Sequence, residues 1–189
     1  ARDGDFQLRV EQTCHHWRVV TRFSFSLFTE EGAPMHMVSQ AGWTESLGGH
    51  QMEFQNQTLI NDELVEEISG TAQTAPDGSG GSVTLTRPAA QEHQLPPGVM
   101  FPISATRWSL SQLQAAKRLV NYIVYDGSSA EPLRVMDLVA GKPAPPDLPK
   151  DADSALFTGR LWHLVTSFFP FNAQDSEPTS THVVDVFDN

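Results

Sequence analysis

The segment 95–119, LPPGVMFPISATRWSLSQLQAAKRL, interrupts a chain that elsewhere alternates apolar and polar residues. Pro96, Pro97 and Pro102 fix backbone torsions and lack amide donors, so the first part of this segment should be extended and stiff. After Pro102 apolar residues recur at intervals of three and four, which is the period of an amphipathic helix. The segment therefore predicts one principal α-helix near residues 104–119.

The start of this helix should be marked by hydroxyl side chains that can cap its free amides. Ser109 and Gln112 have the spacing of a capping box. Leu113, Ala116 and either Leu119 or Val120 would form the apolar stripe. The hydroxyl residues available for the cap are Ser104, Thr106 and Ser109.

The rest of the chain has the period of two that is typical of β-strands with one covered face. The clearest run is 17–27, and a turn at 30–34 closes it. Gly70 is expected at a β-bulge, and the proline-rich segment 141–154 is expected to be a surface connection. The pattern predicts five or six antiparallel strands before the helix and two pairs after it, at residues 6–10, 17–27, 35–39, 52–54, 64–72, 82–86, 120–125, 133–139, 161–169 and 181–187.

Length and charge narrow the class of protein. A chain of 189 residues is most simply a single domain, residues 1–189. Its formal net charge is −11, and no basic run is interleaved with aromatic residues. Nucleic acids and anionic membranes are therefore not expected as partners, because both require positive charge. No segment has the ~20 apolar residues of a transmembrane span.

Large aromatic side chains are too numerous for a thin hairpin and favour a strongly curved sheet with an aromatic concave face. Two interpretations stay open. In the first, the helix fills the concavity as core. In the second, a groove remains for an acyl chain or an apolar peptide segment, because binding sites are commonly concave and apolar. The residues assigned to this groove or core are Trp17, Phe23, Phe25, Phe54, Trp108, Trp162 and Phe168.

Cys14, His15 and His16 form the one cluster with reactive side chains. On a strand, Cys14 and His16 would share a face, as a thiolate nucleophile and its base require. A small buried residue in a strand is the simpler interpretation of Cys14, because free cysteines are commonly buried. No spacing typical of a metal site occurs, so no catalytic, cofactor-binding or metal residues are assigned and no cofactor is expected.

Several short motifs together resemble the EipB-like family, which comprises cell-envelope integrity proteins of alphaproteobacteria long described as a domain of unknown function. The proline-bounded turn and the YDG motif are the most specific. The resemblance runs in order through Gly141, and the strand around Trp162 is similar to the later strands of the family. The motifs are Cys14 followed by Trp17, WTESLGG at 43–49, Gly70 with Thr71 and Ala72, LPPGVMFP at 95–102, Ala115 with Ala116, and YDG at 125–127.

The resemblance implies a periplasmic protein, after removal of a signal peptide, whose spiral or partly open barrel wraps around the helix. It also implies that Cys14 pairs with a cysteine near the family's C-terminus, outside this chain, and that the chain is truncated at both ends. The family tends to place a histidine after its FP pair, whereas Ile103 follows here. No role is carried over for that histidine.

These observations leave three functional hypotheses. The first is a non-catalytic periplasmic scaffold or binding module that supports envelope integrity, acts as a monomer and has an envelope protein or a peptidoglycan-associated component as partner. The second is a carrier of lipid or another apolar ligand in a half-open barrel. The third is a thiol-dependent enzyme that uses Cys14 with His16.

Overall fold

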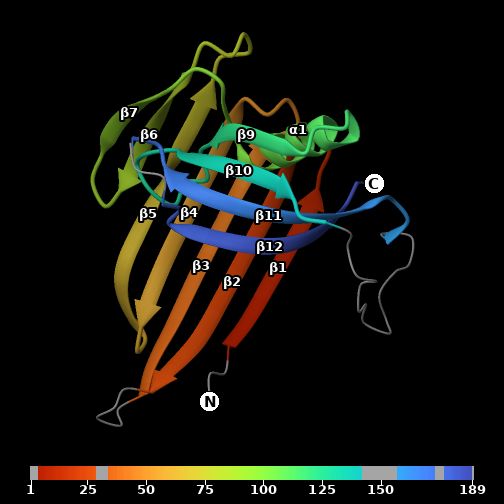
Figure 1. Ribbon diagram of the computed structural model, residues 1–189. Helices are drawn as coiled ribbons and strands as arrows, with labels where there is room; N and C mark the ends of the chain where they lie inside the picture. The colour runs from red at the N-terminus through yellow and green to blue at the C-terminus, as the bar shows by residue number, and fades with distance from the viewer. Residues whose placement is uncertain (1–3, 29–33, 142–156, 173–176, 189) are drawn as a thin grey trace. The chain divides into compact units, whose positions relative to one another are not determined.

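The computed structural model describes residues 4–28, 34–141, 157–172 and 177–188. These residues form antiparallel strands in two sheets and one α-helix (Figure 1). The predicted class, mainly antiparallel β with one principal helix, is confirmed. The chain divides into two compact units, Ala1–Ile103 with Tyr125–Pro132 and Ser104–Val124 with Leu133–Asn189. The single domain over residues 1–189 stays a prediction.

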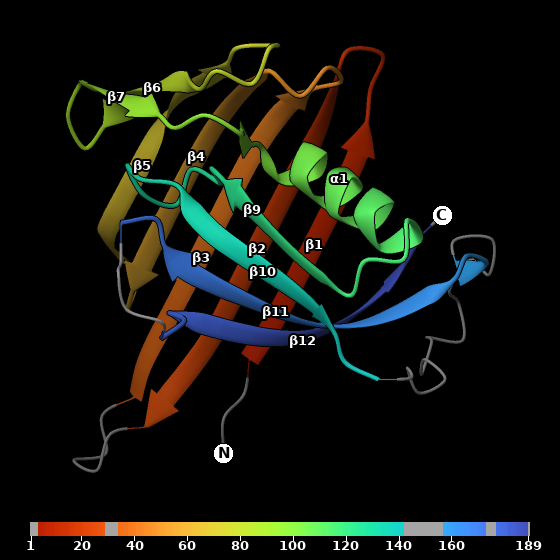
Figure 2. The ribbon, with the colours of Figure 1, turned by 45° about the horizontal axis from the view of Figure 1, so that its top comes forward.

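The first unit is built on a seven-stranded meander in which each strand pairs with the next along the chain (Figures 1 and 2). The sequence predicted five or six strands here, and β7 is the one it missed because QEHQL does not alternate apolar with polar residues. The predicted turn at 30–34 and connection at 141–154 fall largely outside the described residues. The strands are β1 (Gly4–Gln12), β2 (His16–Phe28), β3 (Pro34–Ser46), β4 (Gln51–Ile60), β5 (Glu63–Thr74), β6 (Gly81–Arg87) and β7 (Gln91–Leu95), followed by the short β8 (Val99–Met100).

The meander has one apolar face and one polar face, because successive side chains of a strand point to opposite sides. We call the side that carries Val19, Trp43 and Phe54, which lie directly opposite one another on β2, β3 and β4, the apolar face. Most of the buried core of this unit lies there, including Met52, Phe54, Ala72, Val83 and Leu85. A register shift between Ser69 and Gly70 confirms the predicted bulge.

Helix α1 (Pro102–Gln114) begins before the predicted capping residues. Proline is well suited to the first helical position, because no amide donor is needed there and its φ is already helical. The carboxylate of Glu45, on β3, accepts a hydrogen bond of 2.8 Å from the Ile103 amide. The predicted cap at Ser109 is therefore wrong, and Ser109 is a buried residue in the middle of the helix.

The helix ends at Gln114, five residues before the predicted end at 119. Ala116 has a left-handed φ of 66°. The Lys117 amide donates to the Gln112 carbonyl (3.1 Å) and the Ala116 amide donates to the Leu113 carbonyl (2.9 Å). This pair of bonds is a Schellman motif, which closes a helix. The apolar period that continues to Leu119 therefore belongs to the next strand.

The second unit combines α1 with four antiparallel strands in the order β12-β11-β10-β9, and α1 lies alongside β9 in Figure 2. Leu113 of the helix packs with Val120, Trp162 and Leu164 to form its core. The positions of these strands match the prediction closely. They are β9 (Leu119–Val124), β10 (Leu133–Val139), β11 (Leu161–Pro170) and β12 (Ser180–Phe187).

Replacing Ala116 with glycine should stabilise the protein, because an alanine at positive φ is strained and glycine is not. We expect a gain of about 1 kcal/mol in the free energy of unfolding and a rise of roughly 2–4 °C in Tm, measured by calorimetry. Ala115→Gly is the matched control and should be neutral or destabilising, because φ of Ala115 is not positive. A lower Tm for Ala116→Gly would contradict this account.

Candidate functional site

Four of the predicted aromatic residues lie in the first unit, on the apolar face of the meander. Trp17, Phe23 and Phe25 come from β2, and Phe54 comes from β4. Phe54 is buried, Trp17 and Phe25 are half-buried, and Phe23 is exposed. The apolar face thus passes from buried at β4 to accessible at β2.

The accessible part of this face continues onto the edge strand β1. Phe6 lies opposite Phe23, Leu8 opposite Thr21 and Val10 opposite Val19. We call Phe6, Leu8, Val10 and Phe23 the apolar surface; their side chains are 62%, 58%, 47% and 43% exposed. The sequence shows the alternation that places Phe6, Leu8 and Val10 on one face, but the assignment of groove residues overlooked them.

A tightly packed corner of the first unit explains the YDG motif. The ring of Tyr125 meets the ring of Phe54 edge to face, with centroids 5.6 Å apart. The side-chain amide of Asn56 donates to the Gly127 carbonyl (2.5 Å). Gly127 has φ of 75°, and a Cβ there would lie 2.6 Å from the Phe54 ring. Burial, and then the nearby charge of Asp126, raise the pKa of Tyr125, which keeps it neutral.

The other three predicted aromatic residues lie in the second unit and have different environments. Trp162 is buried, and its indole N–H donates to the Asp188 carboxylate (3.1 Å). This hydrogen bond is the main cause that lowers the pKa of Asp188. Trp108 is exposed with its ring 5.9 Å from that of Tyr122, and half-buried Phe168 contacts a histidine ring.

The second unit also contains a buried carboxylate that sequence reasoning missed. Asp137 of β10 accepts hydrogen bonds from the hydroxyls of Ser109 (2.6 Å), Thr166 (2.7 Å) and Tyr122 (3.0 Å). These donors come from α1, β11 and β9, so the carboxylate of Asp137 connects these three elements with β10. Burial and the charge of Asp137 raise the pKa of Tyr122, so this hydroxyl stays a donor.

The environment of Asp137 gives it a structural role, because a buried charge is tolerated when several donors satisfy it. A signal for it existed in the sequence. Asp137 occupies the same face of β10 as Val135 and Val139, so a polar residue stands in an apolar row. Only the fold identifies its three partners, which come from distant positions in the chain.

The cluster at Cys14 does not have the predicted arrangement. Cys14 is exposed in the turn between β1 and β2, so the prediction of a buried residue in a strand is wrong. His16 begins β2, and Cys14 precedes it in the turn, so the two side chains are not placed on one strand face. As Cys14 is the single cysteine of the sequence, it has no partner for a disulfide within this chain.

The described residues contain neither a metal-binding group of side chains nor a membrane-spanning helix. Within residues 4–28, 34–141, 157–172 and 177–188, no group of three or more His, Cys, Asp or Glu side chains could hold a metal ion. In the same part of the chain, no helix has the length and apolar character needed to cross a membrane.

Comparison with known proteins identifies relatives by sequence pattern and by fold. The model of the EipB-like family matches residues 1–189. The crystal structure of a β-barrel-like protein with a domain of unknown function, from Brucella abortus, superposes with a TM-score of 0.88 at 20% sequence identity. The match covers 100% of this chain and 78% of that protein. No curated protein matches the chain.

Gly127→Ala should destabilise the protein strongly, because the added Cβ combines a strained φ with a clash against Phe54. We expect a loss of about 3 kcal/mol in the free energy of unfolding, measured by urea denaturation. Gly98→Ala is the control, since Gly98 has φ of 78° with open space around its Cβ position. The Gly98→Ala variant should lose only the free energy of unfolding that the strained φ costs, roughly 1–2 kcal/mol. Equal losses would rule out the clash.

Asp137→Ala should also be destabilising, because it removes three hydrogen bonds to a charged group. We expect a loss of about 3 kcal/mol in the free energy of unfolding. Asp185→Ala on β12 provides the comparison, because Asp185 is exposed and its hydrogen bond with the His163 ring should contribute under ~1 kcal/mol. If the two variants unfold at the same urea concentration, Asp137 does not hold the unit together.

Proposed function

Because the chain belongs to the EipB-like family, we propose that it is a non-catalytic periplasmic protein that supports the integrity of the cell envelope. It acts there as a scaffold or a binding module, with an envelope protein or a peptidoglycan-associated component as its partner. The resemblance of its motifs to those of envelope integrity proteins supports this role and this compartment.

The apolar surface is the observation that carries the binding role. Its four side chains lie on two adjacent strands and are all more than two-fifths exposed. Water solvates such a cluster poorly, and an exposed apolar patch commonly marks an interaction site. Phe23 also contacts Phe25, with ring centroids 5.2 Å apart, which extends the patch toward the C-terminal end of β2.

The roles of the buried acidic residues support a non-catalytic protein. Asp137 is hydrogen-bonded by three hydroxyls, and the carboxylate of Glu45 binds a backbone amide at the helix start. Both carboxylates satisfy polar groups of the fold itself. The exposed position of Cys14 in a turn, away from the regular strands, does not support the thiol-enzyme hypothesis.

The same apolar surface favours a second candidate function, the binding or transport of a lipid or another apolar ligand. Aromatic and aliphatic side chains suit an acyl chain, since contacts between them need no polar partner. In this alternative the apolar surface would take up the ligand, whereas in the first it would contact a protein.

Deletion of the gene in a bacterium that encodes it should increase sensitivity to detergent and to drugs that target the cell wall. Wild-type protein should restore resistance, whereas a triple variant of the apolar surface, Phe6→Ser with Leu8→Ser and Phe23→Ser, should not. Leu64→Ser with Val65→Ser is the control, because these residues are exposed to a similar degree at the hairpin between β4 and β5. Full rescue by the triple variant, at equal protein level, would contradict the proposed role of the surface.

Native mass spectrometry of the purified protein distinguishes the two candidates. A carrier should retain lipid that organic extraction releases, and the triple variant of the apolar surface should lose it. A scaffold should show no adduct of lipid mass.

Fractionation of the cells should recover the protein in the periplasm, and its presence in the cytoplasm alone would contradict both candidates.

A further inference from the structure

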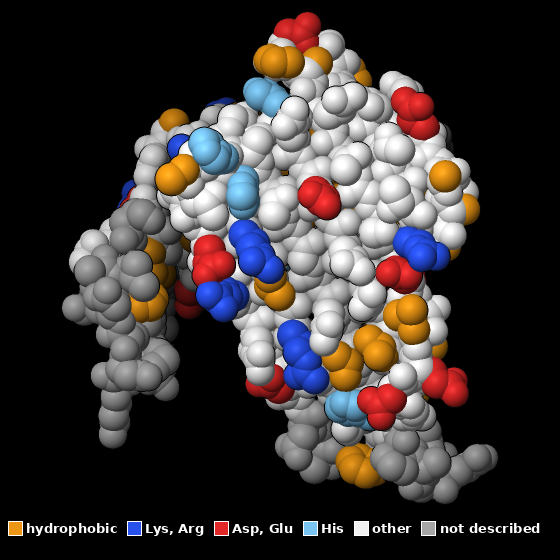
Figure 3. Space-filling view, turned by 180° about the vertical axis from the view of Figure 1, so that it is seen from behind, with side chains coloured by type: hydrophobic (Ala, Val, Ile, Leu, Met, Phe, Trp, Pro, Cys, Tyr) orange, Lys and Arg blue, Asp and Glu red, His pale blue; other side chains and the backbone are white. Residues whose placement is uncertain are grey.

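The polar face of the meander contains a continuous row of residues that crosses all seven strands. Its members lie directly opposite one another in successive strand pairs, so they share one face. Figure 3 shows the molecule from behind, where uncharged polar side chains and backbone dominate and charged side chains are scattered. The row consists of Glu11, Arg18, Thr44, Glu53, Thr71, Thr84 and Glu92.

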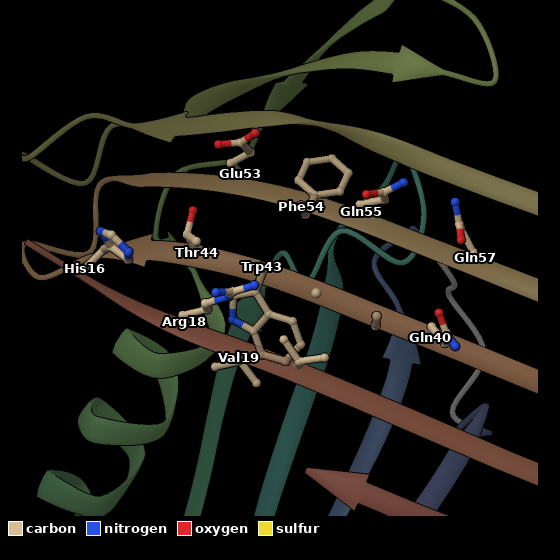
Figure 4. A pocket seen from close by; sticks show the side chains of 13 residues that line it. His16, Arg18, Val19, Gln40, Trp43, Thr44, Glu53, Phe54, Gln55 and Gln57 are labelled. Carbon is tan, nitrogen blue, oxygen red and sulfur yellow. The ribbon is translucent and has the colours of Figure 1, made fainter. Parts of the chain in front are cut away.

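A hollow of about 490 Å³ lies beside this row, around Gly42 of β3. Gly42 has no side chain, and Thr44 follows it on the same face. Longer side chains surround the two, among them Arg18 from β2 and Glu53 from β4 (Figure 4). Three glutamines from β3 and β4 also line the hollow, namely Gln40, Gln55 and Gln57.

This hollow is one of four that adjoin one another across the sheet. It shares Arg18 and Val20 with a hollow over β1 and β2. On the other side it shares Thr44 and Glu53 with a hollow of about 520 Å³ that reaches β6. That hollow shares Gln73 with the fourth, which extends to β7. We call the four together the polar groove; six strand spacings give it a length of roughly 29 Å.

Many side chains of the polar groove are free to bind a ligand. Within the described residues, Arg18, Gln40, Thr44 and Glu53 make no hydrogen bond or ion pair through their side chains. The strand ladders fix the backbone beneath these groups, so binding a ligand orders side chains only and costs less conformational entropy than ordering a loop as well.

The charge of the groove differs from that of the whole chain. Three arginines and three glutamates line it, so their charges balance, whereas the chain has a net charge of −11. A polyanion or a polycation would find no excess of opposite charge there. The balanced charges and the many amide and hydroxyl groups suit an uncharged ligand. The charged residues are Arg9, Arg18, Arg22, Glu11, Glu53 and Glu92.

We infer that the polar groove binds an uncharged glycan chain that lies across the strands. Each sugar hydroxyl both donates and accepts hydrogen bonds, and so does each glutamine amide. Arginine adds donors and glutamate adds acceptors, which together match a polyhydroxylated chain. The shape agrees, because a groove about 29 Å long accommodates several sugar units in a row.

The position of the groove favours a glycan over an extended peptide. Peptides commonly bind a sheet by adding a strand at its edge, where backbone groups are unpaired. The polar groove runs across the strands, and the strand ladders already use the backbone groups beneath it. A ligand there must bind through side chains. This inference goes beyond the envelope role and does not depend on the apolar surface.

Isothermal titration calorimetry with cellohexaose, maltohexaose and chitohexaose tests the proposal. We expect saturable binding of at least one hexasaccharide to the wild-type protein. Gly42→Val should weaken that binding about tenfold or more, because its side chain fills the central hollow. The fold should tolerate it, since the nearest atom to a Cβ at this position is the Val19 carbonyl oxygen at 3.8 Å and valine favours strands.

Ser39→Val is the matched control, because it places the same side chain on β3 but on the opposite face. It should leave the affinity unchanged, and all variants should keep their thermal unfolding midpoint or raise it. Gln40→Ala should weaken binding less than Gly42→Val. The proposal is overturned if no hexasaccharide binds at millimolar concentration, or if Gly42→Val binds as well as the wild type. It is also overturned if heparin or an uncharged Ser-Gly decapeptide binds where the hexasaccharides do not.

Discussion

The alternation of side chains along each strand is the constraint on which the first unit depends. Because neighbouring residues point to opposite sides, each strand must supply one apolar and one polar row at the same time. Pairing in register then joins these rows into two faces. The apolar face provides the core and the apolar surface, and the polar face provides the polar groove. Two surfaces of opposite chemistry thus follow from one backbone pattern.

The second unit depends more on a single buried charge. Asp137 binds hydroxyls from a helix and two neighbouring strands, so the position of α1 relative to β9, β10 and β11 is linked to one carboxylate. Glu45 serves the first unit in a related way by binding the Ile103 amide. In both cases a charge that would be costly to bury alone is stabilised by polar groups that also need partners.

Local patterns predicted the elements well and their ends less well. The run at 133–139 is a strand with those bounds, because alternation depends only on neighbouring residues. Helix α1 was placed correctly, but its start and end were not. Its start uses Pro102 and the distant Glu45, and its end uses a left-handed Ala116 where glycine is the usual signal. The exposure of the site residues was harder to predict, because periodicity treats these aromatic residues alike. Phe54 and Trp162 are buried, whereas Trp108 and Phe23 are exposed.

By itself the sequence determined the antiparallel class, the principal helix and the family, because these depend on periodicity and on short motifs that are visible along the chain. Only the tertiary structure decided which rows of residues adjoin one another. Strand pairing joins Phe6 to Phe23, places Arg18 beside Thr44 and brings Tyr122 to Asp137. Such neighbours are set by register and packing between segments far apart in sequence, and a pattern read along one strand contains no information about its partners.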